Sequence, residues 1–173
     1  KHMEYKDFEY DFVERTLRNI EWIEKQNSIV KDDPTSMTFY EFTNLINQCL
    51  GLIILVKELS DDSFVKSLPQ AIEHYSLRKT DIDGLADNDL ILLNVLTHLR
   101  NSIAHGHIQQ SDDGNDEITE VVFWDAKPWE LKKENKDMTI DNAEVKIFLT
   151  FEKLKNFANT IANEYLIKKR IKQ

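Results

Sequence analysis

Only one cysteine, four glycines and three prolines occur among the 173 residues of this chain. The lone Cys49 excludes an internal disulfide, and no secretory signal opens the chain, so we expect a cytosolic protein. The scarcity of glycine and proline argues against a collagen-like repeat and a turn-rich β-sandwich. Because 41% of the residues are hydrophobic, the chain can bury a core, which argues against disorder.

Long apolar runs are also absent. The longest covers residues 45–56 and includes Asn47 and Gln48, whereas a membrane-spanning helix needs about 20 predominantly apolar residues. We therefore expect no membrane span. The opening Lys1-His2-Met3 is typical of a cloning remnant followed by a native start, so His2 is left out of any site.

Basic residues are fewer than acidic ones, 22 against 31, which gives a net charge of −9. This charge disfavours loose binding to a polyanion. Residues 109–144 carry a local charge of −7, from 11 acids and 4 bases, whereas residues 145–173 carry +5, from 7 bases and 2 acids. The basic cluster over 168–172 can contact a nucleic acid. It is also typical of a solvated helix end, where cations favour the negative pole of the helix dipole.

The spacing of the apolar residues predicts long amphipathic helices in the first half of the chain. The first covers residues 4–25, and a polar loop follows over 27–36. The second begins at Ser36 or Thr38, because Glu41 stands three residues after Thr38 as in a capping box.

This second helix continues to Val56 and is interrupted by Gly51. Alanine there would favour the helix by about 1 kcal/mol, so we expect a neighbouring backbone to approach Gly51 closely. Residues 59–84 are irregular and predict loops around one or two short helices.

A third helix is predicted from Asp87 to Gly106, since glycine commonly follows a helix end. Residues 117–124 and 145–149 are rich in β-branched and aromatic side chains and predict strands. Thr150 then caps a last helix.

Together these elements predict a mainly α fold in one domain over residues 1–173. Residues 109–149 form an acidic β-hairpin, or a small sheet, inserted before the last helix.

A polar stripe accompanies the apolar residues of the third helix. Asn94, His98, Asn101 and His105 follow one another at intervals of 4, 3 and 4, which places them on one face. A solvated face normally carries Lys and Glu, whereas Asn and His tolerate partial burial at a cleft or interface. Arg100 beside them adds a forked cation, and His105 adds an imidazole, a side chain suited to proton transfer; phosphate chemistry requires both kinds of group.

The segment over 99–106, Leu-Arg-Asn-Ser-Ile-Ala-His-Gly, resembles the signature of the HEPN superfamily. That signature is an Arg, a polar residue, three spacer residues and a His, at the C-terminal end of a long helix. The stretch over 42–58 is similar to another family helix, although its apolar pattern is less specific. The resemblance implies a HEPN-like up-and-down helical bundle and, as in many members, a metal-independent RNase without a cofactor.

The resemblance further implies a homodimer in which two such helices build one composite cleft for RNA. In the implied mechanism His105 moves the proton of the ribose 2′-hydroxyl or of the leaving 5′-oxygen. Arg100 stabilises the charge on the phosphorane, and Asn101 orients His105 or the phosphate. The products would be a 2′,3′-cyclic phosphate and a 5′-hydroxyl. A toxin or antiviral defence setting, with an antitoxin or another defence protein as partner, is implied as well.

Three neighbouring residues leave alternatives open. Some HEPN toxins have a modified tyrosine two residues after the motif histidine, but His107 stands there, so that control mechanism is not transferred. His107 either lines the cleft as a second titratable group or is a solvated loop histidine. Asn94 and His98 are expected to line the cleft, and His98 is alternatively a satisfied interface histidine.

Other chemistries have weaker support. His105 and His107 with the acids of residues 112–116 do not fix a coordination geometry, so we expect no metal. No glycine-rich phosphate loop, serine elbow or paired zinc motif occurs. Trp124 and Trp129 can stack on bases or form a small satellite core.

Two further functions stay open. One is a HEPN-like sensor that binds RNA or a nucleotide without turnover, which the acidic surface favours. The other is a structural adaptor, in which the polar stripe is an ordinary interface, Arg100 bonds carbonyls and His105 caps the helix.

Overall fold

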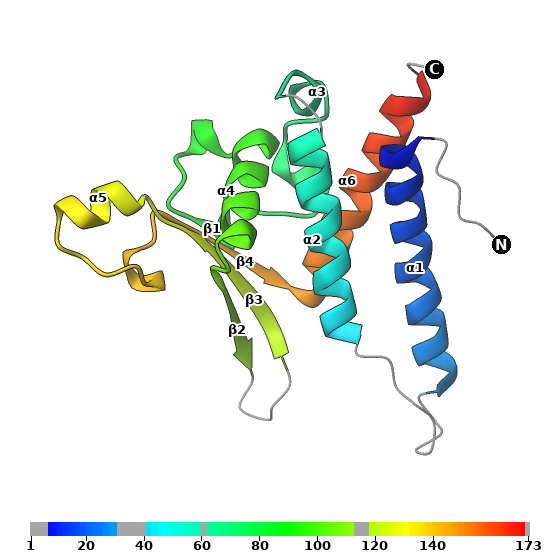
Figure 1. Ribbon diagram of the computed structural model, residues 1–173, viewed down its shortest axis with the longest axis horizontal. Helices are drawn as coiled ribbons and strands as arrows, with labels where there is room; N and C mark the ends of the chain where they lie inside the picture. Colours follow the sequence, from blue (N-terminus) through cyan, green and yellow to red (C-terminus); the bar gives the residue numbers. More distant parts are fainter. Residues whose placement is uncertain (1–6, 31–40, 60–61, 113–117, 172–173) are drawn as a thin grey trace.

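The computed structural model describes residues 7–30, 41–59, 62–112 and 118–171 (Figure 1). The α-helices are α1 (Phe8–Val30), α2 (Glu41–Leu59), α3 (Asp62–Lys66), α4 (Leu92–Ala104), α5 (Pro128–Lys133) and α6 (Phe151–Ile171). The strands are β1 (Ile82–Asp83), β2 (Ile108–Asp112), β3 (Ile118–Asp125) and β4 (Val145–Thr150). Short 3-10 turns cover residues 72–75, 79–81, 87–89 and 140–142. The described chain is mostly helical, as predicted.

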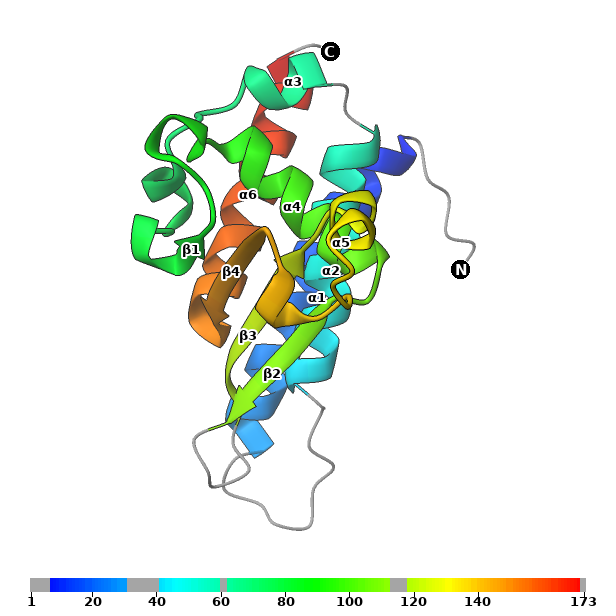
Figure 2. The ribbon, with the colours of Figure 1, turned by 90° about the vertical axis from the view of Figure 1, so that its left-hand side faces the viewer.

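Three long helices pack side by side, and α1 runs antiparallel to α2 and α6 (Figures 1 and 2). The strands form an antiparallel sheet in the order β1-β4-β3-β2. Helix α4 contacts both α2 and β3, so it lies where the helical layer meets the sheet. The core contains buried residues from every one of these parts, among them Val13, Ile53, Leu96, Phe123 and Phe157.

The sheet is larger than the predicted hairpin. The strands predicted over 117–124 and 145–149 correspond to β3 and β4, and these two strands pair with each other. However, β3 makes its hairpin with the unpredicted strand β2, and β4 pairs on the other side of β3. The sequence of β2, Ile-Gln-Gln-Ser-Asp, is too polar to predict a strand. Hydrogen bonding to β3, rather than burial of its side chains, holds β2 in the sheet.

Helix α1 begins and ends later than the predicted residues 4–25. The Asp7 carboxylate accepts a hydrogen bond from the backbone N–H of Tyr10 at 3.1 Å and so caps the helix ahead of Phe8. At the other end the polar residues continue the helix to Val30, and Ser28 Oγ donates to the Lys25 carbonyl at 2.8 Å. The loop predicted over 27–36 is therefore wrong for residues 27–30, which belong to α1, and its remainder over 31–36 lies outside the described residues, as does Thr38 of the predicted capping box.

Helix α4 begins at Leu92 rather than at Asp87, because residues 87–91 form other backbone hydrogen bonds. Ile91 is extended and pairs with Ala71, and the Leu92 N–H donates to the Gln70 carbonyl at 2.9 Å. Residues 87–89 form a separate 3-10 turn.

The predicted cap of α6 and the predicted neighbour of Gly51 in α2 have different outcomes. The Thr150 cap of α6 is confirmed, since its Oγ accepts from the Lys153 N–H at 3.3 Å. The close neighbour of Gly51 is a side chain and not a backbone, because a Cβ there would lie 3.3 Å from Cζ of Phe12.

A carboxylate joins the outer helices α1 and α6. Glu9 accepts hydrogen bonds from Tyr165 at 2.7 Å and from Lys169 at 2.5 Å. These bonds hold the pKa of Glu9 below its ordinary value of 4.5, although burial opposes them. The folded state therefore favours ionised Glu9 more than the unfolded chain does, and this stabilisation disappears as the pH falls through the lowered pKa.

We expect Glu9→Gln to lower the free energy of unfolding by about 1 kcal/mol at pH 7. The difference from wild type should shrink below about pH 4.5, where Glu9 begins to protonate in the unfolded chain. Urea unfolding at pH 7 and at pH 3 measures it. Glu14→Gln, which breaks an exposed pair with Arg18, is the control and should change stability by less than 1 kcal/mol.

Candidate functional site

The polar stripe is held in place by the buried face and the end of α4. Leu92, Val95, Leu96 and Leu99 are buried, which fixes the rotation of the helix. At its end the His107 N–H donates to the Ser102 carbonyl and the Gly106 N–H to the Ile103 carbonyl. This is the Schellman arrangement, with Gly106 at φ +69°. It ends α4 at the predicted glycine and leaves His105 exposed.

Two stripe residues converge on one carboxylate from the sheet. His98 Nδ1 lies 2.8 Å and Asn101 Nδ2 lies 2.9 Å from Oδ2 of Asp125, the last residue of β3. Burial alone would raise the pKa of Asp125, but the hydrogen bonds from His98 and Asn101 outweigh it and lower that pKa. Asp125 is therefore ionised at neutral pH.

Within the described part of the chain, Arg100 is held by side chains and not by backbone carbonyl groups. Its Nε donates to Oε1 of Glu58 on α2 at 2.6 Å, and its Nη1 donates to Oδ1 of Asn101 at 3.2 Å. Both Arg100 and Glu58 are partly exposed, so the pair is open to solvent. The chain of contacts runs from Glu58 through Arg100, Asn101 and Asp125 to His98, and we call these five residues the polar chain.

His105 belongs to a second group of side chains. Its ring centroid lies 5.6 Å from that of His107, whose ring stacks on Trp124 at 3.8 Å with an interplanar angle of 9°. Burial and the neighbouring His105 lower the pKa of His107, against smaller opposing effects of Asp125 and the Trp124 backbone. His107 is thus a packed residue rather than a solvated loop histidine. The face of Trp124 toward His107 is not open to a base.

The predicted site residues thus fall into separate groups. Asn94 donates to the Asp89 carbonyl at 2.9 Å and secures the start of α4. Among the described residues, no hydrogen bond or ion pair joins Arg100 to His105. Their positions on an ideal helix differ by about 140°, so a single chain does not bring their side chains together.

Sequence reasoning missed Asp125 and Glu58. For Asp125 a signal existed, because Val121 and Phe123 are buried on one face of β3 and a period of two puts Asp125 on that face. An acid on a core face normally has a polar partner. For Glu58, which pairs with a residue 42 positions away, no local pattern pointed to the contact.

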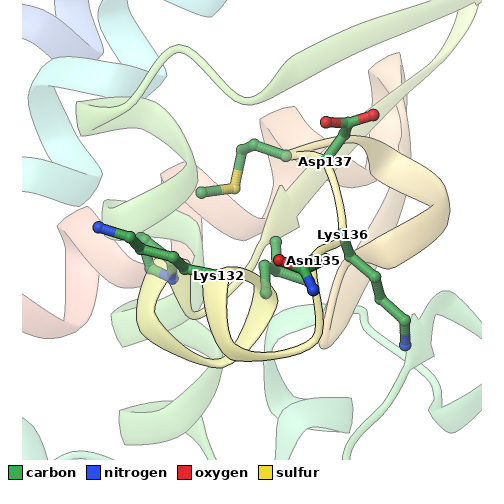
Figure 3. A pocket seen from close by; sticks show the side chains of 7 residues that line it. Lys132, Asn135, Lys136 and Asp137 are labelled. Atoms are coloured by element: carbon green, nitrogen blue, oxygen red, sulfur yellow. The ribbon is translucent and has the colours of Figure 1, made fainter.

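The rest of the described chain offers weaker candidates. A shallow hollow of about 410 Å³ lies on the α5 segment, where the labelled Lys132 and Lys136 extend away from each other (Figure 3). Trp129 on the same segment is 57% exposed, whereas Leu131 is buried. In the basic cluster over 168–172, Lys169 and Arg170 bond to residues of α1.

Neither a metal cluster nor a membrane span occurs within the described ranges. No group of three or more His, Cys, Asp and Glu there could hold a metal ion, and residues 113–116 lie outside those ranges. Burial raises the pKa of Cys49 to about 12, so its thiol is unreactive. None of the described helices has both the length and the apolar character to cross a bilayer.

Comparison with known proteins gives a family match that covers nearly the whole chain. The family model described as HEPN pEK499 p136 matches residues 3–173. No curated protein and no solved structure matches the chain.

Proposed function

Because the chain belongs to the HEPN pEK499 p136 family, we propose that it is a metal-independent endoribonuclease. The observation that carries the proposal is the exposed His105 at the end of α4, five residues after an Arg100 that is bonded to Asn101. The proposal includes action in the cytosol as part of a toxin or antiviral defence system, with an antitoxin or another defence protein as partner.

In the proposed reaction the ribose 2′-oxygen attacks the adjacent phosphorus and the bond from phosphorus to the 5′-oxygen breaks. The 2′-hydroxyl gives up its proton and the leaving 5′-oxygen takes one, so the products are a 2′,3′-cyclic phosphate and a 5′-hydroxyl. His105 moves one of these protons, since imidazole titrates near neutral pH. Arg100 stabilises the negative charge that develops on the phosphorane oxygens.

The site is composite in this proposal. Since Arg100 and His105 diverge around α4, we place the ends of two α4 helices face to face, so that Arg100 of one protomer meets His105 of its partner. An RNA phosphate between them would bind the Arg100 guanidinium beside Glu58, because that guanidinium is only partly enclosed. Analytical ultracentrifugation should therefore detect a homodimer.

The test is cleavage of end-labelled single-stranded RNA in excess EDTA, followed by analysis of the product ends. We expect cleavage that EDTA does not suppress and products that carry a cyclic phosphate and a 5′-hydroxyl. Products with 5′-phosphate ends, or complete loss of activity in EDTA, would contradict the proposal.

A second function, an RNA or nucleotide sensor without turnover, is favoured by one contact. Glu58 already neutralises the cation that would serve the phosphate, at 2.6 Å. In that case RNA or a nucleotide would bind to the dimer and be recovered intact. Binding without cleavage across varied RNAs would favour the sensor over the nuclease.

A further inference from the structure

At Asp125, the last residue of β3, the sheet contacts helix α4, which carries Arg100 and Asn101. Its side chain is 13% exposed, and its Oδ2 accepts from His98 at 2.8 Å and from Asn101 at 2.9 Å. Hydrogen bonds to an ionised carboxylate are about twice as strong as those between neutral groups. A carboxylate with two donors at the rim of the core therefore has one defined position.

This carboxylate determines how the Asn101 amide is turned. An amide has one acceptor and one donor end. With Nδ2 donating to Asp125, Oδ1 faces Arg100 and accepts from Nη1 at 3.2 Å. The reverse orientation would place an oxygen against the carboxylate and an amino group against the guanidinium, so both contacts would become repulsive.

We propose that Asp125 is a positioning residue for Arg100, acting through Asn101, in the reaction proposed above, on which this inference rests. Asn101 and Glu58 hold the guanidinium at Nη1 and Nε. Neither N–H group of Nη2 bonds to a residue that the structure describes, so both remain for a phosphate oxygen. The same carboxylate keeps a proton on Nδ1 of His98, which donates to it at 2.8 Å.

The positioning matters because Arg100 acts on charge that appears only in the transition state. A displacement of about 1 Å in such a group can reduce the rate about a hundredfold. Without Asp125 the Asn101 amide is free to turn, and Arg100 keeps only its partly exposed contact with Glu58.

The test compares Asp125→Asn with wild type in steady-state RNA cleavage. Asparagine has the size of aspartate but not its charge, so we expect kcat to fall between about tenfold and a hundredfold and KM to change less than about threefold. Because Asp125 acts through Asn101, adding Asp125→Asn to Asn101→Ala should lower kcat no further. Asp141→Asn, which removes a charge from an exposed position between β3 and β4, is the matched control and should leave kcat unchanged.

Nuclear magnetic resonance of ¹⁵N-labelled protein gives a readout that does not need activity. In wild type we expect His98 with its proton on Nδ1 and one set of Asn101 side-chain amide signals, and in Asp125→Asn a mixture of states. An active wild type with an unchanged kcat in Asp125→Asn would overturn the inference and leave the proposed function standing. If wild type cleaves no RNA, the proposed function fails, and identical His98 and Asn101 signals in both proteins would overturn the positioning as well.

Discussion

His105→Ala should lower kcat/KM for RNA cleavage about a thousandfold, since general acid–base catalysis contributes between about a hundredfold and ten thousandfold. The fold should be unaffected. His105 is exposed at the end of α4, and its described side-chain contact is the ring of His107. Removing such a side chain usually changes stability by less than about 0.5 kcal/mol. Cleavage kinetics and thermal unfolding of the same preparation measure the two effects.

The control for His105→Ala is His74→Ala. His74 is also an exposed histidine with one polar partner, Glu164 at 2.9 Å, but it lies in the turn over residues 72–75 that packs on α6. We expect it to keep wild-type kcat/KM. If His105→Ala cleaves RNA as fast as wild type, the histidine has no catalytic role. Unfolding of His105→Ala would instead favour a helix-capping role.

Gly84→Ala should be the most destabilising of the substitutions considered. A Cβ at residue 84 would lie 1.8 Å from the carbonyl oxygen of Glu144, and Gly84 has φ +92°. Because the obstacle is backbone at the start of β4, the clash can be relieved only by separating β1 from β4. We expect a loss of at least about 3 kcal/mol in the free energy of unfolding.

Gly106→Ala is the matched comparison, because it shares the positive φ without the clash. Gly106 has φ +69°, and a Cβ added there would meet no atom of the described chain within 4 Å. Its cost is the left-handed backbone alone, about 1 to 2 kcal/mol. Thermal unfolding should therefore show Tm lowered about 10 °C for Gly84→Ala and about 4 °C for Gly106→Ala. Equal losses would mean that backbone strain, and not the contact with Glu144, dominates at Gly84.

Helix positions were predictable where apolar periodicity and a capping residue coincided. The last helix follows Thr150, α4 ends before Gly106, and the HEPN resemblance is confirmed by the family match. Periodicity failed where tertiary contacts decided the outcome. Ile91 continues the apolar pattern of α4 but pairs as an extended residue with Ala71, and nothing in the sequence reveals that partner.

The candidate site was predictable only in part. The stripe with Arg100 identified one helix, because helical spacing is a local property. The side chains that orient its residues come from other elements, and their contacts depend on how α2, α4 and β3 pack. Asp125 lies 24 residues from Asn101 along the chain. Long-range pairs of this kind leave little trace in a single sequence.

The polar chain also has a consequence for biosynthesis. A nascent chain that has emerged only as far as residue 112 already contains the whole Arg-Asn-x-x-x-His segment, but it lacks Asp125 and the strand that carries it. Local helix formation is fast, whereas pairing over long separations comes later because loop closure has to precede it. The His98 and Asn101 side chains, which bond to Asp125, therefore become ordered only after β3 has docked. On the function proposed above, an unfinished chain on the ribosome, which contains RNA, would carry the motif before Asn101 has its ordering partner.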